Sequence, residues 1–568
     1  MKMMRGRYDM RIITEEYLDT SIDQLKDELR KELPAFAELG HKFVSKEISS
    51  AEFKATSGGM GVYAQRSGSE FMIRLRALGG ILDFEKLNFV YQLAKQFSLD
   101  SIHLTTRQMI QLHHLTLDIM IQIMKEAIDH DMITRGSGGN YPRNATISPL
   151  SGVELGEAFD VTPYAILVNK YFLSQINSYR LPRKFKVAFS NHGKDSAKAS
   201  IADLGFLAIK KEEKEYFQVY LGGSMGPNGA TSVLYDELIS PCDILYHVEA
   251  LLSLFTEEGD YHNKAKARIR FIVARMGSEA FLACYKKHLT KIKQTKELSF
   301  ALNKEEQKAI KEQRIFEEQK ITKLQKISKE QIIEQNLVEE EAKDISYSIP
   351  EAILQKQANL YSVDIHPQGG FLNTKDLGKL LHFIENLNQI EVRLTMEGSM
   401  ILRNLTAKQA KELLELTRDI RKTTRLGQSI SCVGASICQI GIQNSQDLLK
   451  DILDYFADKG FTEDRLPSLA ISGCSNSCSR HQVSEIGFQG KMKRVNDVLT
   501  DAYSLQIGGF VGMGESRLAK DYGDLVVSVI PEFLYQLALQ LVDYNLEFRE
   551  YMIKKEEEFI KLLEQYRV

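Results

Sequence analysis

Four of the six cysteines of this chain lie within 47 residues, and their spacing limits the chemistry open to them. Cys432 and Cys438 form a C-x5-C pair, and Cys474 and Cys478 form a C-x3-C pair after a gap of 35 residues. Structural zinc sites mostly use C-x2–4-C pairs, so zinc fits the first pair poorly. A disulfide is disfavoured by the expected reducing compartment, and catalytic thiols usually occur singly or as C-x-x-C. Four thiolates are the full ligand set of a [4Fe–4S] cluster, which is the interpretation that the count favours.

Basic residues in three short motifs are candidates for binding a small oxyanion. They are Arg74 in "FMIRLR", Arg143 in "YPRN", and Lys184 and Lys186 in "LPRKFK". Lys184 and Lys186 are two residues apart on an expected strand, so both side chains should point to one face. Arginine suits fixed, bidentate oxyanion binding, whereas a lysine whose pKa is lowered among like charges can donate a proton. Each residue alone is more simply a solvated surface charge, so this interpretation depends on the four together.

An internal repeat provides the elements that must position these residues. The 38 residues from Gly79 match the 38 residues from Gly369 without a gap, and 9 positions are identical. Each copy has the pattern of a Gly-Gly turn, an amphipathic helix and two strands, and a preceding strand and a following helix complete a ferredoxin-like half. Chance similarity between two ordinary α/β units is the alternative, and an ungapped match of this length disfavours it.

The two copies differ in charge at matching positions. At the same offset of 290 residues, the basic residues Arg74, Arg76 and Arg107 of the first copy correspond to Asp364, His366 and Glu397 of the second. Cys432 follows the second copy at almost the place where Arg143 follows the first. We therefore expect a duplicated, pseudo-symmetric chain in which one half binds an anion and the other holds a metal centre.

Composition and charge restrict the class of protein further. The chain has 568 residues, too many for one hydrophobic core, and its net charge of −3 gives no general attraction to nucleic acid or anionic membranes. We expect no signal peptide and no membrane span, because no long apolar segment occurs. Six cysteines in this length do not form a disulfide scaffold, so the expected compartment is the cytoplasm. The Lys- and Glu-rich residues 285–345 are expected to form a solvated helical connector.

The cysteine motifs and their neighbours resemble the siroheme- and [4Fe–4S]-containing sulfite and nitrite reductases. The signature of that family is C-x5-C, a gap, then G-C-x-N-x-C followed by E-x-G-x-x-G, and it is met here by "CVGASIC" and "SGCSNSCSRHQVSEIGFQG". Further motifs occur in the family's order, among them "IHLTTRQMIQLHH", "YPRN", "LPRKFK", "NKAKARIRF" and "YSLQIGGFVGMG". The resemblance covers nearly the whole chain, and the family is also built from duplicated halves.

The resemblance implies a role for each matching residue. Cys432, Cys438, Cys474 and Cys478 would hold a [4Fe–4S] cluster, and Cys478 would also bind the siroheme iron. The residues that match the substrate-binding set are Arg74, Arg143, Lys184 and Lys186. Siroheme carries eight carboxylates, and the residues expected near them or near the macrocycle rim are Arg76, Arg107, Gln111, His113, Lys266, Asn476 and Arg480. For His113, a core histidine is an equally good interpretation.

The expected fold class is α+β, with duplicated ferredoxin-like halves forming a central domain plus two α/β domains for siroheme and the cluster, related by pseudo-two-fold symmetry. The expected domains are an N-terminal helical arm (1–50), the first ferredoxin-like half (51–142), a siroheme and substrate domain (143–284), a charged helical connector (285–350), the second half (351–425) and a cluster and siroheme domain (426–568).

The family divides by substrate at the last residue of "PRKFK". Sulfite reductases resemble this sequence, whereas nitrite reductases usually carry Asn at the position of Lys186. We therefore expect six-electron reduction of sulfite to sulfide, with nitrite reduction or a non-catalytic iron–sulfur electron carrier as alternatives. No flavin or nicotinamide fingerprint is present, so the electrons should come from a ferredoxin or another donor protein.

Overall fold

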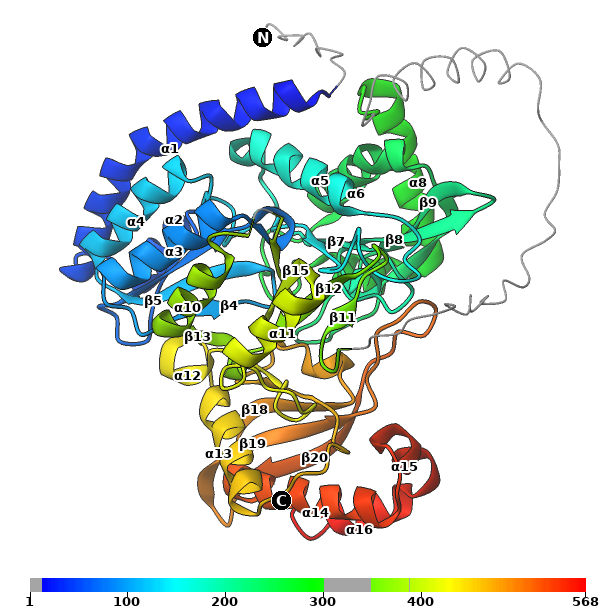
Figure 1. Ribbon diagram of the computed structural model, residues 1–568. Coiled ribbons are helices and arrows are strands. Elements are labelled where there is room, and N and C mark those ends of the chain that lie inside the picture. Colours follow the sequence, from blue (N-terminus) through cyan, green and yellow to red (C-terminus); the bar gives the residue numbers. More distant parts are fainter. Residues whose placement is uncertain (1–12, 301–348, 388) are drawn as a thin grey trace, which may run out of the picture.

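The computed structural model describes residues 13–300, 349–387 and 389–568 (Figure 1). Within these residues it shows an α+β protein with four five-stranded sheets. Two sheets are built from the repeat, and one mixed sheet follows each copy of the repeat in the chain. This arrangement confirms the predicted fold class of duplicated ferredoxin-like halves with two further α/β units. No described helix is long and apolar enough to cross a membrane.

The two ferredoxin-like sheets exchange a strand with each other. The order of one sheet is β1 (Val62–Ala64), β2 (Phe71–Arg76), β5 (Met109–Leu115), β4 (Ser101–Leu104) and β13 (Phe371–Asn373). The order of the other is β11 (Ile353–Leu354), β12 (Leu360–Ile365), β15 (Met400–Thr406), β14 (Glu391–Leu394) and β3 (Ile81–Leu82). Strand β13 of the second copy thus pairs antiparallel with β4, and β3 of the first copy pairs with β14. The exchange joins the two halves into one unit.

A Gly-Gly turn precedes each exchanged strand. Gly79 and Gly369 both have a φ of 59°, with ψ values of 14° and 16°. Gly80 and Gly370 also have positive φ values, of 75° and 81°. A side-chain carbon on Gly370 would stand 2.8 Å from Leu104 O, so this turn needs glycine for its backbone conformation and for the close approach of the exchanged strand. The matching geometry at the predicted offset confirms the repeat.

Amphipathic helices pack against these sheets. They are α1 (Glu15–Val44), α2 (Ser50–Ser57), α3 (Phe84–Gln96), α4 (Leu117–Asp129), α10 (Thr374–Ile384) and α11 (Ala407–Leu416). Thr116 and Thr406, at matching positions of the repeat, begin α4 and α11 by accepting hydrogen bonds from backbone N–H groups three residues later. The apolar sides of these helices and both sheets bury one shared hydrophobic core.

The two mixed sheets form a second structural repeat. One contains β10 (Val233–Ile239), β9 (Lys214–Leu221), β8 (Leu204–Lys211), β7 (Val187–Ser190) and β6 (Thr146–Ile147). The other contains β16 (Ile430–Ser431), β17 (Leu469–Ser472), β18 (Ile486–Val495), β19 (Val498–Ile507) and β20 (Lys520–Val526). In each sheet the first three strands in the chain are parallel and the last two are antiparallel. This second structural repeat agrees with the predicted pair of α/β domains related by pseudo-two-fold symmetry.

Each mixed sheet has its own helices and its own apolar core. The first is accompanied by α5 (Thr162–Ser174), α6 (Ile244–Glu258), α7 (Ile269–Met276) and α8 (Ser278–Thr295). The second is accompanied by α12 (Gly434–Ile437), α13 (Ser445–Asp458), α14 (Ile530–Asp543), α15 (Phe548–Lys554) and α16 (Glu556–Leu563). The predicted arm contains α1, and the predicted connector contains the end of α8 together with residues 301–348, which lie outside the described residues.

Candidate functional site

The four cysteines predicted to hold a cluster lie at the ends of two neighbouring parallel strands. Cys432 follows β16, Cys438 ends α12, and Cys474 and Cys478 lie in the loop after β17. The backbone N–H groups of residues 442 and 443 both donate to Gly473 O at 2.9 Å, which joins the two cysteine-bearing loops. The fold therefore brings together two motifs that are 35 residues apart in the chain.

Small residues and N–H donors surround these thiols. Gly473 N donates to Cys432 Sγ at 3.2 Å, and Asn476 Nδ2 donates to Cys474 Sγ at 3.4 Å. A side-chain carbon on Gly473 would stand only 2.4 Å from Gln443 O, so the loops could not approach this closely with a larger residue. Hydrogen bonds to sulfur and a close backbone are what an iron–sulfur cluster requires, so these residues fit that group.

The cysteine thiols affect one another's pKa values, which shows that they lie close together. Burial, together with the nearby Cys478, raises the pKa of Cys432 to about 11. Burial also raises the pKa of Cys474, where Cys478 and Cys438 act in the same direction. A metal centre offsets this cost because it binds the thiolate form. In the described part of the chain, no three His, Cys, Asp or Glu side chains converge on a single metal ion. A [4Fe–4S] cluster binds each thiolate through a different iron, so its four ligands lie farther apart than the ligands of one ion.

Cys478 lies next to the first half of the chain. Thr106 Oγ1 donates to Cys478 O at 3.1 Å, and Thr106 directly precedes Arg107. In the first mixed sheet, Ser148 and Ser196 occupy the positions that Cys432 and Cys478 have in the second. There, Ser196 Oγ donates to Ser148 Oγ at 2.7 Å. The first mixed sheet thus has a hydrogen bond between two serines at the positions where the second mixed sheet has two cysteines.

The loop before Arg143 brings two predicted substrate arginines together. Arg143 donates from Nη2 to Gly139 O at 2.6 Å and from Nη1 to Ser137 O, which Arg74 Nη1 also reaches at 3.4 Å. Tyr63, in β1, was not predicted, yet the Arg74 guanidinium lies 5.2 Å from its ring centroid. Although burial opposes the change, Arg143 and Arg74 lower the pKa of the Tyr63 phenol.

Lys184 and Lys186 lie on either side of Phe185, whose side chain is fully buried. In this extended segment both lysines therefore lie on the face opposite to Phe185. Burial, together with Arg268 and Arg143, lowers the pKa of Lys184 to about 7. Burial, Lys184 and neighbouring guanidinium groups also lower the pKa of Lys186 well below its usual range. A lysine with a pKa of about 7, such as Lys184, can donate a proton near neutral pH.

Two buried arginines that were not predicted belong to the same group. Arg268 and Arg270 are each 5% exposed, whereas the predicted Lys266 is exposed in the loop before α7. Arg268 Nη2 lies 2.8 Å from Oδ2 of the buried Asp203. Arg270 donates to Pro227 O at 2.7 Å, inside the glycine-rich loop 221–229. The alternation of basic and apolar residues in "KARIR" is the sequence signal that could have identified both.

Several buried guanidinium nitrogens have no hydrogen-bond partner among the described residues. In the first half of the chain they are Arg76 Nε and Nη1, Arg107 Nε, Arg143 Nε, Arg268 Nε and Arg270 Nε, and in the second half they are Arg403 Nε and Arg421 Nε. Burial lowers the pKa of Arg107, and the neighbouring Arg143 lowers it further. A ligand with several carboxylates would supply the missing acceptors and countercharges, so this cation group fits siroheme.

The remaining predicted cofactor residues lie around this group. Gln111 pairs with Arg74 across β5 and β2. His113 is 6% exposed, and burial lowers its pKa well below the usual range, so the ring is neutral. Asn476 is exposed beside Cys474, and Arg480 Nη2 donates to Met396 O at 2.7 Å. Their contacts with siroheme stay predictions.

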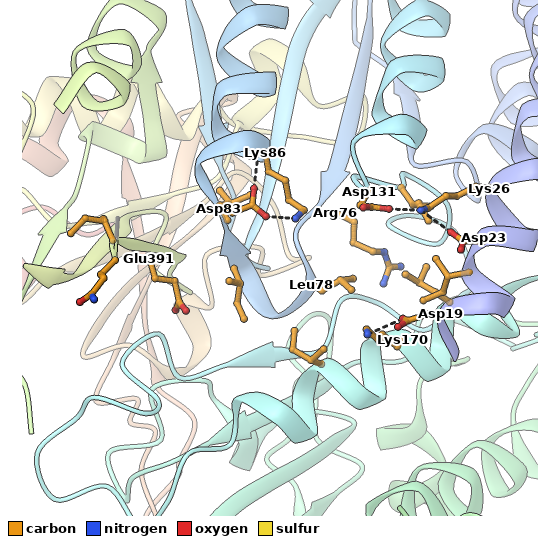
Figure 2. Close-up of a pocket in the computed structure, with 18 of the residues that line it drawn as sticks. Asp19, Asp23, Lys26, Arg76, Leu78, Asp83, Lys86, Asp131, Lys170 and Glu391 are labelled. Atoms are coloured by element: carbon orange, nitrogen blue, oxygen red, sulfur yellow. Dashed lines mark hydrogen bonds and ion pairs between the residues drawn. The ribbon is translucent and has the colours of Figure 1, made fainter. Parts of the chain in front are cut away.

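Arg76 lines a cavity of about 700 Å³ between α1, α5 and the junction of β3 with β14 (Figure 2). Its Nη2 donates to the backbone oxygens of residues 135 and 142 at 3.3 and 3.4 Å. The other cations that line the cavity are paired with carboxylates: Lys26 with Asp23 and Asp131, Lys86 with Asp83, and Lys170 with Asp19. No other predicted site residue lines it, and Arg143 acts on Arg76, so this cavity meets the cation group at Arg76 alone among the predicted site residues.

Two family models match the chain. The model described as "Nitrite/Sulfite reductase ferredoxin-like half domain" matches residues 63–129 and again 353–420. The model described as "Nitrite and sulphite reductase 4Fe-4S domain" matches residues 138–293. These ranges together cover just over half of the chain. The second match falls on the first mixed sheet, whose repeat carries the four cysteines.

Individual relatives agree with these models. A protein named ferredoxin–nitrite reductase from Synechococcus elongatus is 26% identical over 482 residues, which are 83% of this chain and 86% of that protein. A protein named sulfite reductase [ferredoxin] 1 from Mycolicibacterium paratuberculosis is 23% identical over 458 residues, 78% of this chain and 74% of its own. The solved structure of the NirA protein of Mycobacterium tuberculosis superposes with a TM-score of 0.73 at 18% identity, covering 94% of this chain and 97% of that one, which shows the shared fold.

Proposed function

This chain belongs to the family of nitrite and sulfite reductases, and from that premise we propose that it reduces sulfite to sulfide with electrons from a ferredoxin. The observation that carries the proposal is the meeting of Arg143, Lys184 and Lys186 in one buried cation group beside Cys478. Relatives named as ferredoxin-dependent reductases support the choice of donor. The absence of a nucleotide fingerprint in the sequence agrees with a separate donor protein.

The proposed cofactors are a [4Fe–4S] cluster and siroheme. When bound, the cluster supplies electrons one at a time and siroheme supplies the iron that takes the substrate. Cys432, Cys438, Cys474 and Cys478 would hold the cluster, and Cys478 would be the thiolate shared with the siroheme iron. Its position beside Thr106 and Arg107 supports this role, because the predicted carboxylate-binding residues lie on that side. Arg107 and Arg268 have buried nitrogens free to bind siroheme carboxylates.

The chain's own residues bind the oxyanion and move its protons. Arg74 and Arg143 are held by shared backbone acceptors, which fixes their guanidinium groups before substrate arrives. Six electrons and seven protons convert one sulfite into hydrosulfide and three waters, so proton donors must lie at the oxygens. Lys184 and Lys186 are suited to this, because burial among cations lowers the pKa of both ammonium groups.

Lys186 supports sulfite rather than nitrite as the substrate. Sulfite is a dianion when deprotonated and is larger than nitrite, so a further cation at this position stabilises it more. Nitrite is a second candidate, because the relative from Synechococcus elongatus is named a nitrite reductase. The two substrates share the same site and differ in how strongly they need Lys186.

The decisive measurement is the ratio of kcat/KM for sulfite to that for nitrite. We expect Lys186→Asn to lower this ratio about tenfold, which corresponds to about 1.4 kcal/mol of differential transition-state binding. Reduced methyl viologen or a ferredoxin would supply electrons to enzyme prepared anaerobically with siroheme. Lys210→Asn is the control, because Lys210 is exposed on β8 and paired with Glu213.

Two outcomes would contradict the proposal at different levels. An unchanged substrate ratio in Lys186→Asn would remove the reason for choosing sulfite. A colourless wild-type protein that reduces neither anion would overturn the reductase function itself.

A further inference from the structure

Asp203 is a fully buried carboxylate inside the cation group, and no sequence motif pointed to it. It lies between the short helix η3 (Ala199–Ile201) and β8. Its Oδ2 accepts a hydrogen bond from the backbone N–H of Lys186 at 2.9 Å. Both of its oxygens also accept from Arg268 Nη2, at 2.9 and 2.8 Å. One side chain therefore contacts both the segment that carries Lys186 and the buried guanidinium of Arg268.

The backbone of Lys186 is held on both sides by the same short segment. Leu204 N donates to Lys186 O at 3.1 Å, while the preceding residue, Asp203, accepts from Lys186 N. The adjacent Phe185 accepts from Arg143 N at 2.8 Å. The lysine segment is thus fixed between Arg143 and Asp203, which sets the distances among the cations that would meet the substrate.

The charge of Asp203 also matters, because Arg268 is surrounded by other cations. Arg268 acts on Lys184, Lys186, Arg107 and Arg143, and lowers the pKa of each. A buried cation without a counterion strongly destabilises a fold. The Asp203 carboxylate compensates Arg268 directly and reduces the repulsion that the lysines experience.

We propose that Asp203 is the positioning residue of the anion site, holding Lys186 and Arg268 in the geometry that anion reduction requires. It acts through these two residues and does not itself touch the substrate. The inference rests on the proposed reductase function, and it identifies the acidic residue that assembles the cation group.

The proposal has a consequence for pH dependence. The groups that act on Lys186 are Lys184 from its own segment, Arg107 from the turn before β5, Arg268 from the start of α7 and Asp203 from the start of β8. The three cations and burial lower the pKa of Lys186, whereas Asp203 raises it. Removing the Asp203 charge should therefore make the lysine lose its proton at a lower pH.

Asp203→Asn tests this role, because it removes the charge and keeps the shape. We expect the alkaline limb of the pH profile for anion reduction by the holoenzyme to move down by about one pH unit. Asp195→Asn is the matched control. Asp195 is also fully buried in the same unit, but it accepts from Ser190 Oγ and from the N–H groups of residues 199 and 200, and no cation contacts it in the described residues. Asp195→Asn should lower stability without moving the pH profile.

A second readout uses the protein without cofactors. If Asp203 compensates Arg268, then Asp203→Asn should lower the thermal unfolding temperature, and adding Arg268→Gln should restore part of the loss. An unshifted pH profile in Asp203→Asn, or a double variant no more stable than Asp203→Asn alone, would overturn the positioning role. If the wild-type enzyme reduces neither sulfite nor nitrite, the proposed function fails, while the stability comparison still decides the role of Asp203.

Discussion

Cys478 has different surroundings from the other three cysteines of the proposed cluster. It is exposed, whereas Cys474 is buried and Cys432 and Cys438 are half-buried. Its loop contacts Thr106 and so faces the cations of the first half. These features suit a thiolate that serves the cluster on one side and the siroheme iron on the other.

We expect Cys478→Ser to reduce the content of both proposed cofactors. A serine oxygen binds iron more weakly than a thiolate, so the cluster would lose one ligand and the siroheme iron would lose the thiolate proposed to be shared with it. Iron, acid-labile sulfide and the visible absorption spectrum would measure this. Cys284→Ser, in α8, should leave all three unchanged, because Cys284 lies outside the cage. Full cofactor content in Cys478→Ser would contradict the shared-ligand role.

Among the elements, the exchanged strands β3 and β13 decide how the two halves are joined. Each follows a Gly-Gly turn, and each pairs with a strand of the other copy. The exchange places β2 and β5, which carry Arg74 and Gln111, in a sheet that contains a strand from residue 371 onward. The geometry of the anion site therefore depends on a turn distant from it in sequence.

We expect Gly370→Ala to lower the free energy of unfolding by about 2–3 kcal/mol. A left-handed alanine costs roughly 1 kcal/mol, and its Cβ would also stand 2.8 Å from Leu104 O. Gly460→Ala is the control, because Gly460 also has a positive φ but has no atom within 4 Å of the added carbon. Urea unfolding should show the larger loss in Gly370→Ala. Equal losses would mean that the close approach of the exchanged strand does not matter.

The molecule as a whole gathers buried cations at the meeting of its two halves. Arg107 and Arg143 come from the first ferredoxin-like half and the loop after it, and Arg268 comes from the first mixed unit. Arg480 comes from the cysteine-bearing unit, and it acts on Arg107. Without an anionic cofactor these charges repel one another, so the fold should be least stable when all of them are protonated.

This leads to a prediction for the cofactor-free protein. Burial lowers the pKa of Lys184 to about 7 in the folded state, from 10.5 in the unfolded chain. The unfolded chain therefore binds more protons between these values, and stability rises with pH there by up to about 1.4 kcal/mol per unit. Below pH 7, where Lys184 is protonated in both the folded and the unfolded state, its charge destabilises the fold to the full extent. Urea unfolding between pH 7 and 9 should show this slope.

Lys184→Met should reduce the slope, whereas Lys194→Met should keep it, because Lys194 is exposed. The same slope in Lys184→Met and wild type would show that another group causes it. Loading with siroheme should reduce the slope as well, since its carboxylates favour the charged lysine.

The sequence by itself determined the features that depend on residue type and on spacing along the chain. The number of clustered cysteines predicts a metal centre, and the Gly-Gly repeat shows in the sequence because both residues of each turn have positive φ values, which favour glycine. The fold class follows from that repeat. The three motifs that contain Arg74, Arg143, Lys184 and Lys186 predict an oxyanion site because all four basic residues match the substrate-binding set of the family that the chain resembles.

Only the tertiary structure decided how the halves join and which buried groups complete the site. The strand exchange, Tyr63 and Asp203 leave no local pattern, because each depends on contact between segments far apart in the chain. The physical reason is that the energetic effect of a charged side chain depends on whether it is buried and on which groups surround it. Asp203 resembles any other aspartate in the sequence, and its role comes from being enclosed with Arg268 at 2.8 Å and from accepting the Lys186 N–H at 2.9 Å.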